Sequence, residues 1–216
     1  MQPFTLETER LVLDELRESD AQSMHEYCQD PEFERYLTIP WPYTLADARW
    51  FITEHAPAGW RDGSDLIWAV RRNDGSGTLL GVVGLRDKFG QYDIGFWLGR
   101  PHRGTGIVPE AINAVLDWAF GSSHEGLTSV SWECLVGNEA SMIVARKLGF
   151  TFTGTRPSTL PARGGSHPPS WHGLLRASDD RSVKPGWPRS PAVGTAATRD
   201  AAVDSADAQN EGQGAP

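Results

Sequence analysis

The chain has 216 residues, of which 39% are hydrophobic and 22% are charged, and this length suits one domain with a substantial core. The formal net charge of −8 argues against nucleic-acid binding, and no apolar run is long enough to span a membrane. The N-terminus has no signal-peptide pattern, and Cys28 and Cys134 lack metal-ligand spacing, so we expect reduced thiols in a cytoplasmic protein.

One strand and two helices are predicted in the first third of the chain. Residues 11–16 have the composition of a short strand. A capping box at residues 19–22 begins a helix that reaches about residue 29. A second capping signal at residues 44–47 begins a helix that Pro57 and Gly59 are expected to end.

Three strands follow closely and predict an antiparallel meander. They cover residues 66–70, 78–85 and 92–98, and turn signals separate them at residues 73–75 and 90–91.

A long amphipathic helix is predicted over residues 106–120. Ala111, Val115 and Ala119 lie on one stripe, and Pro109 falls in the first turn, where its missing N–H costs nothing. Further elements are predicted in chain order: a strand over 127–135, a helix over 138–148, and strands over 150–155 and 170–175.

The composition changes near residue 178, after which hydrophobic residues become rare. We therefore predict a domain over residues 1–178 and a disordered, low-complexity tail over residues 179–216. Trp187 lies within this predicted tail, where we interpret it as a stray aromatic residue rather than a docking residue.

The segment that carries most information is the loop Arg103-Gly104-Thr105-Gly106, which joins an apolar strand to the long helix. Glycine lets the backbone approach a ligand closely, and the first N–H groups of a helix have no partner within it. These features predict an anion site for a phosphate or pyrophosphate. A nucleoside-triphosphate loop would need Gly-Lys-Ser/Thr, and a dinucleotide fold would need a parallel βαβ unit; neither pattern is present.

The loop resembles the pyrophosphate signature of the GNAT acetyltransferase superfamily, Arg/Gln-x-x-Gly-x-Gly/Ala. Arg103 and Gly106 match this signature, whereas Val108 replaces its final small residue. A second block, with Asn138 and Ser141 followed by residues 146–150, is similar to the RimJ/RimL-like branch, which includes ribosomal-protein alanine N-acetyltransferases. Thr8-Glu9-Arg10-Leu11-Val12-Leu13 is also typical of that branch, and the resemblance covers about residues 6–176.

This resemblance implies an α/β (α+β) fold with a mixed, mostly antiparallel twisted sheet of about seven strands. Helices would cover both faces, and the central strands would splay into a V. The implied reaction is direct transfer of an acetyl group from acetyl-CoA to a primary amine in a ternary complex. No metal, nucleic acid or membrane is implied, and a monomer or homodimer is expected.

The resemblance also implies which residues would bind acetyl-CoA. The central strand would contribute main-chain groups to the pantetheine arm, and the loop would hold the pyrophosphate. Ser141 would protonate or hydrogen-bond the departing thiolate. The implied coenzyme-binding residues are Phe96, Trp97, Leu98, Arg103, Gly104, Thr105, Gly106, Ile107, Val108, Asn138 and Ser141.

Asp93 is our first candidate for the general base, because it begins the central strand and would point into the cleft. Glu133 and His172 on neighbouring strands are alternatives, and a chain of water molecules could also replace a dedicated base. We expect His102 to contact solvent or phosphate and Cys134 to be a packed thiol rather than an acyl carrier.

The sequence is also compatible with two other functions. The first is acetylation of a small-molecule amine such as an antibiotic, with residues 33–60 and their Trp41, Trp50 and Trp60 forming the acceptor wall. The second is a non-catalytic module that binds acyl-CoA.

Overall fold

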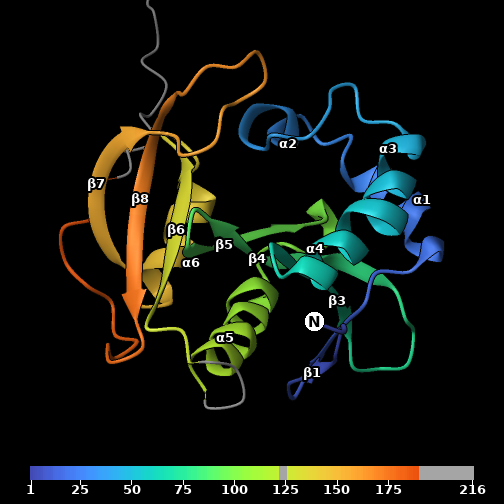
Figure 1. Cartoon of the computed structure of the whole chain (residues 1–216), viewed down its shortest axis with the longest axis horizontal. Helices are drawn as coiled ribbons and strands as arrows, with labels where there is room; N and C mark the ends of the chain where they lie inside the picture. Colours follow the sequence, from blue (N-terminus) through green and yellow to red (C-terminus); the bar gives the residue numbers. More distant parts are fainter. Residues whose placement is uncertain (122–125, 190–216) are drawn as a thin grey trace, which may run out of the picture.

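The computed structural model describes residues 1–121 and 126–189 (Figure 1). Its eight strands form one sheet in the order β1-β2-β3-β4-β5-β6-β8-β7. The strands are β1 (Leu6–Glu7), β2 (Leu11–Asp14), β3 (Asp65–Arg72), β4 (Leu79–Lys88), β5 (Gln91–Leu98), β6 (Ser129–Leu135), β7 (Thr151–Pro157) and β8 (Pro169–Arg176). The mixed, mostly antiparallel sheet is confirmed, and the two-residue strand β1 is additional to the predicted strands.

Helices cover both faces of this sheet. They are α1 (Ala21–Tyr27), α2 (Pro31–Tyr36), α3 (Leu45–Trp50), α4 (Ala56–Asp62), α5 (Ile107–Phe120) and α6 (Glu139–Lys147), with short 3-10 turns at Glu18–Asp20 and Arg100–His102. Helices α5 and α6 pack into one hydrophobic cluster, and α1, α2 and α3 pack into another on the opposite face.

Strands β5 and β6 are the only parallel neighbours in the described sheet, and they pair at a single position, Asp93 with Ser131. Beyond this pair the two strands separate towards their C-terminal ends. Figure 1 shows β6, β8 and β7 set apart from β1–β4, with β5 between them. The predicted V-shaped splay is therefore confirmed.

The helix predicted to end at Pro57 and Gly59 continues to Asp62, so that expectation was wrong. A π-helical turn, Phe51–His55, joins α3 to α4, and Pro57 then falls in the first turn of α4, where proline is tolerated. Gly59 is needed inside the helix because a Cβ there would lie 2.3 Å from the carbonyl oxygen of Asp65.

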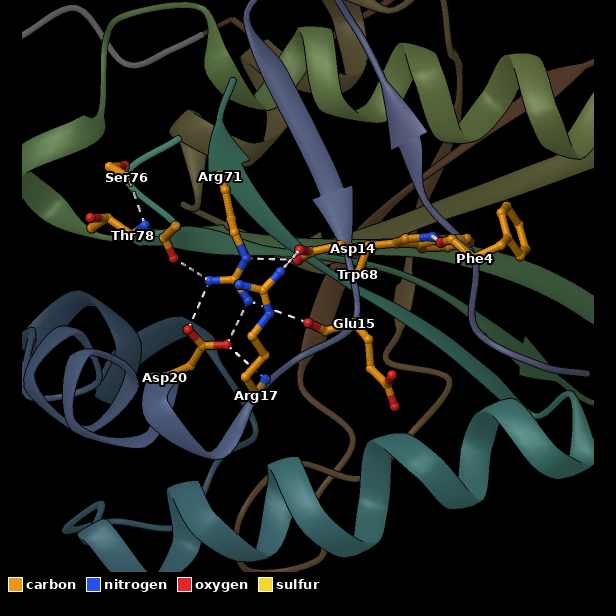
Figure 2. A network of polar contacts seen from close by, with 10 residues as sticks. Phe4, Asp14, Glu15, Arg17, Asp20, Trp68, Arg71, Ser76 and Thr78 are labelled. Atoms are coloured by element: carbon orange, nitrogen blue, oxygen red, sulfur yellow. Dashed lines mark hydrogen bonds and ion pairs between the residues drawn. The ribbon is translucent and has the colours of Figure 1, made fainter. Parts of the chain in front are cut away.

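A buried ion network fixes β2 and the start of α1 to β3 (Figure 2). The Arg71 side chain is only 2% exposed. Its Nε lies 2.7 Å from Asp14 Oδ1, and its Nη2 lies 2.7 Å from Asp20 Oδ2. The half-exposed Arg17 also pairs with Asp14. The network pairs the buried charges of Arg71, Asp14 and Asp20 with one another. It lies at β2 and β3, away from the splay between β5 and β6.

The described part of the predicted tail, residues 179–189, packs against the domain. The Arg181 guanidinium pairs with Asp117 and Asn113 of α5, and a Cβ on Gly149 would lie 2.6 Å from Arg181 Cα. The Trp187 ring lies 5.7 Å from Trp132, so the interpretation of Trp187 as a stray aromatic residue was wrong. The rest of the predicted tail, residues 190–216, lies outside the described residues. No described helix is both long and apolar enough to cross a membrane.

Candidate active site

A cleft of about 430 Å³ opens where β5 and β6 separate. Residues from α2, the start of α5 and α6 complete its walls. It brings together most of the residues that the sequence resemblance implied. These are Phe96, Trp97, Leu98, Arg103, Gly104, Gly106, Ile107, Val108, Asn138 and Ser141.

One end of the cleft has the geometry of an anion cradle. Gly104 and Gly106 both have φ of 78°, a conformation that glycine adopts without strain. Gly106 precedes α5 without a side-chain cap, and no hydrogen bond joins the N–H groups of residues 104–108 to another described residue. These donors and the positive end of α5 favour a negatively charged group.

Thr105 and Arg103 differ from the other residues of this loop. Thr105 does not line the cleft, and its hydroxyl donates to the carbonyl oxygen of His102 at 2.7 Å. Arg103 lines the cleft, but its guanidinium pairs with Asp30 at 2.9 Å and donates to the carbonyl oxygen of Leu98 at 3.0 Å. Arg103 therefore already ties the start of α2 to the end of β5.

Ser141 is held by two hydrogen bonds on the opposite wall. Its backbone N–H donates to Asn138 Oδ1 at 3.2 Å, which confirms Asn138 as the cap of α6. The indole N–H of Trp132 donates to Ser141 Oγ at 3.1 Å. The hydroxyl proton of Ser141 is thereby directed to another acceptor, and the Cys134 sulfur on the same cleft wall is within hydrogen-bonding reach of this hydroxyl. Trp132 was missed by sequence reasoning, because its place in an apolar strand pattern indicates only a core residue.

Asp93 lies at the floor of the splay and does not line the cleft. Its carboxylate pairs with Lys88 Nζ at 2.9 Å and accepts a hydrogen bond from Ser131 at 3.2 Å. Burial raises the pKa of Asp93 to about 6, although Lys88 opposes the shift. Asp93 faces a second cavity, of about 360 Å³, on the side of the sheet away from α5.

Glu133 lines both the cleft and this second cavity. Its Oε1 accepts a hydrogen bond from the Thr159 N–H at 3.0 Å, and its Oε2 lies 3.4 Å from Lys88 Nζ. Burial would raise the pKa of Glu133, but the bond from Thr159 and the charge of Lys88 together hold that pKa below its ordinary value. Glu133 is therefore a carboxylate at neutral pH in contact with the cleft.

His172 lies beside Glu133, with its Nδ1 3.9 Å from Glu133 Oε2. It lines the second cavity and not the cleft. Burial lowers the pKa of His172, and its buried Nε2 has no hydrogen-bond partner among the described residues. Of the three candidate bases, only Glu133 reaches the cleft.

The other reactive side chains are occupied or packed. His102 does not line the cleft, and its Nε2 lies 2.9 Å from the Tyr27 hydroxyl. Cys134 lines the cleft, but burial raises the pKa of its thiol to about 12, so it is a poor nucleophile at neutral pH. No group of three or more His, Cys, Asp and Glu side chains in the described ranges could hold a metal ion.

The mouth of the cleft is formed by α2, which the sequence analysis did not predict. Phe33, Tyr36 and Leu37 line the cleft there. The Tyr36 hydroxyl donates to the carbonyl oxygen of Gly137 at 2.8 Å and so joins α2 to the turn between β6 and α6. The sequence signal for α2 was Asp30-Pro31, an N-cap followed by proline at the first helical position.

The expected acceptor wall of three tryptophans was wrong. Trp60 is buried in the core against Trp68, and Trp50 is 57% exposed and packs on His55. Neither of them lines the cleft, and Trp41 does not line it either. The segment instead contributes through α2 and its C-terminal end, with Glu32, Phe33, Tyr36 and Leu37 lining the cleft.

An open splay in a mixed sheet, with a glycine cradle at the start of the following helix, is the arrangement that the resemblance implied for an acyl-CoA-dependent acyltransferase. The GNAT acetyltransferase domain model matches residues 10–151. An uncharacterized N-acetyltransferase of Bacillus licheniformis, p20, is 32% identical over 167 residues, which cover 74% of this chain and 89% of p20. The chain therefore belongs to the GNAT acetyltransferase family, and it acetylates amines with acetyl-CoA as the donor.

Two solved structures show the same fold at lower identity. An acetyltransferase from Salmonella typhimurium that modifies the N-terminal serine of a 50S ribosomal subunit protein has a TM-score of 0.67 and 18% identity, covering 80% of this chain and 99% of that one. The microcin self-immunity acetyltransferase MccE, solved with acetyl-CoA and AMP, has a TM-score of 0.64 and 22% identity, covering 78% of this chain and 93% of that one.

Proposed function

We propose that this chain transfers the acetyl group directly to a slender primary amine, within a ternary complex formed in the cleft. The observation that carries this proposal is that one cleft contains the glycine cradle at the start of α5, the Ser141 hydroxyl and the Glu133 carboxylate. An acyl donor with a pyrophosphate and a thioester needs a cradle at one end and a proton donor near the sulfur.

The residues of the cleft fit acetyl-CoA. A Cβ on Gly104 would meet no atom within 4 Å, so the backbone of the cradle is open to a ligand. Acetyl-CoA supplies the acetyl group as a thioester. The main-chain groups of Phe96, Trp97 and Leu98 are proposed to hold its pantetheine arm, and the N–H groups of residues 104–108 its pyrophosphate. Asn138 is proposed to bind the arm in addition to capping α6.

We assign proton transfer to Glu133 and Ser141. The acceptor arrives as an ammonium ion, and Glu133 takes one proton so that the nitrogen can attack. The new nitrogen–carbon bond forms as the carbon–sulfur bond breaks, and Ser141 protonates the sulfur. The second proton lost from the nitrogen returns through solvent to Ser141, and Glu133 releases its own proton to solvent. The overall reaction thus frees one proton.

Asp93 is proposed to support this chemistry rather than act as the base. It lies outside the cleft lining, and Lys88 links it to Glu133. The hydrogen bond from Thr159 and the charge of Lys88 offset the effect of burial on the pKa of Glu133, so Glu133 is ionised and can accept a proton at neutral pH.

The acceptor is proposed to be slender because contacts restrict the mouth of the cleft. The Tyr36 hydroxyl bonds to Gly137 across the mouth, and Arg163, from the loop between β7 and β8, donates to the carbonyl oxygens of Glu34 and Ile39. A protein N-terminus or a small alkylamine could pass such a mouth.

Acetyl-CoA as donor, together with free Cys28 and Cys134, supports a cytoplasmic location.

Calorimetry with acetyl-CoA, followed by thiol-release assays with N-terminal peptides and small amines, tests this proposal. We expect binding and thiol release that depends on one of the two amine classes. Glu133→Gln should lower kcat by about a hundredfold or more, while Asp93→Asn should retain most of it. Binding without release for any amine would instead support an acyl-CoA-binding module, and no binding at all would overturn the proposal.

A further inference from the structure

Gly95 lies in the middle of β5, at a position where glycine weakens a strand and is not needed for the fold. Its φ is not positive, so no left-handed conformation requires glycine. A Cβ built on Gly95 would meet no atom within 4 Å. Neither the backbone nor the packing of the described residues therefore explains this glycine.

Other glycines of the domain contrast with it. A Cβ on Gly81 would lie 2.3 Å from the carbonyl oxygen of Trp97, and one on Gly99 would lie 2.8 Å from the Tyr27 ring. Those two glycines are required by close packing. Gly84, which pairs with Gly95 across β4 and β5, would accept a Cβ with ordinary contacts of 3.5 Å.

Gly95 lies opposite Glu133, the proposed base. Strands β5 and β6 meet at Asp93 and Ser131, so Gly95 and Glu133 each lie two residues further along and face each other across the splay. Both line the cleft. Gly95 is the exposed residue of β5, while its neighbour Ile94 is buried.

The open space over Gly95 is on the side of the sheet away from the cradle. Ile94 and Leu98 pack in the same hydrophobic cluster as Ile107 of α5. Because side chains alternate along a strand, Gly95 and Trp97 face the opposite side, where Trp97 packs against Phe33 of α2. A donor held by the N–H groups at the start of α5 enters from the other side. The acceptor is thus the ligand with access to this space.

We propose that Gly95 determines acceptor specificity: the acceptor nitrogen and the carbon bonded to it occupy the space over Gly95, against Glu133. This inference rests on the proposed function. The ligand is a primary ammonium ion, because the carboxylate of Glu133 faces that space. A side chain on residue 95 would occupy the volume that the substituents on the acceptor carbon need.

Gly95→Ala and Gly95→Val test this inference, with Gly84→Ala as the matched control on the same face of the adjacent strand. The acceptors are two matched pairs, peptides that begin with glycine or serine, and propylamine with isopropylamine. Members of a pair differ in branching at the carbon beside the nitrogen. Each variant is also measured for acetyl-CoA affinity by calorimetry and for melting temperature.

We expect Gly95→Ala to keep the melting temperature or raise it slightly, and to change the acetyl-CoA Kd by less than about twofold. It should lower kcat/KM for the branched acceptor about tenfold more than for the unbranched one. One extra carbon that a pocket must accommodate changes kcat/KM by about tenfold or more. Gly95→Val should lower kcat/KM for both members, and Gly84→Ala for neither.

Three results would overturn the inference. If the kcat/KM values of Gly95→Ala for the acceptors equal those of the wild type, the acceptor does not occupy the space over Gly95, although the proposed function stands. If Gly95→Ala weakens acetyl-CoA binding by the same factor as turnover, the donor occupies the space. If the wild type binds acetyl-CoA but acetylates no amine, the proposed function and this inference both fail.

Discussion

The indole nitrogen of Trp132 lies 3.1 Å from the hydroxyl oxygen of Ser141, so a buried residue of β6 donates a hydrogen bond to a residue of α6 in the cleft. This donor leaves the serine proton directed to another acceptor. Trp132 is thereby a positioning residue, since it acts through Ser141.

Trp132→Phe is expected to keep the aromatic packing but remove this donor. The Ser141 hydroxyl would lose its orientation, and kcat should fall about tenfold, or roughly 1.4 kcal/mol, while KM for acetyl-CoA stays near the wild-type value. Steady-state kinetics measures both. Trp68→Phe is the control, because it loses a comparable bond to the carbonyl oxygen of Phe4. Equal kcat losses in the two variants would mean that the effect is only structural.

Ser141→Ala is expected to lower kcat at least as much as Trp132→Phe and to leave acetyl-CoA affinity unchanged. If Trp132 acts through Ser141, the double variant should be no slower than Ser141→Ala alone. Additive losses in kcat would show that the two residues contribute independently.

Asp93 should make the stability of the protein depend on pH. Burial raises the pKa of Asp93 to about 6, so the native state binds its proton more tightly than the unfolded state. This contribution is fully present below the unfolded pKa and is lost as the pH rises through about 6. The free energy of unfolding of the wild type, minus that of Asp93→Asn, should therefore increase between pH 7 and pH 4, by at most about 1.4 kcal/mol per pH unit. Denaturant titrations at several pH values measure this difference, and a decrease would contradict the prediction.

Arg71→Met is expected to destabilise the domain strongly. It leaves the carboxylates of Asp14 and Asp20 buried without their main partner, which costs about 3 to 5 kcal/mol. The half-exposed Arg17 pairs with the same Asp14, and Arg17→Met should cost less than about 1 kcal/mol (Figure 2). Chemical denaturation compares the two variants, and equal losses would show that burial of Arg71 does not determine the cost.

Trp187→Ala tests whether the C-terminal segment belongs to the domain. Its ring packs on Trp132 and on Phe152, at 5.7 and 5.6 Å between ring centroids. Because Trp187 is partly exposed, we expect a loss of about 2 kcal/mol in the free energy of unfolding. Since Trp187 packs on Trp132, kcat should also fall, but by less than in Trp132→Phe. Val183→Ala, at a residue that is 52% exposed, should change neither quantity. An unchanged free energy of unfolding in Trp187→Ala would contradict the prediction.

Local patterns predicted much of the architecture. The meander of β3, β4 and β5 and the helices α5 and α6 appear close to their predicted positions, because alternation, helical periodicity and capping act within a few residues. The sequence did not predict α2 or the continuation of α3 into α4. Gly59, a helix-ending signal by itself, is required there by the approach of Asp65.

The sequence by itself determined the family and the anion cradle, because the left-handed glycines 104 and 106 and the start of α5 are local features of the chain. Only the tertiary structure decided which carboxylate reaches the cleft. Asp93 and Glu133 lie on adjacent strands, but Asp93 is at the point where the strands join, and Glu133 is where they have separated. That difference depends on the register and divergence of two strands that are distant in the sequence.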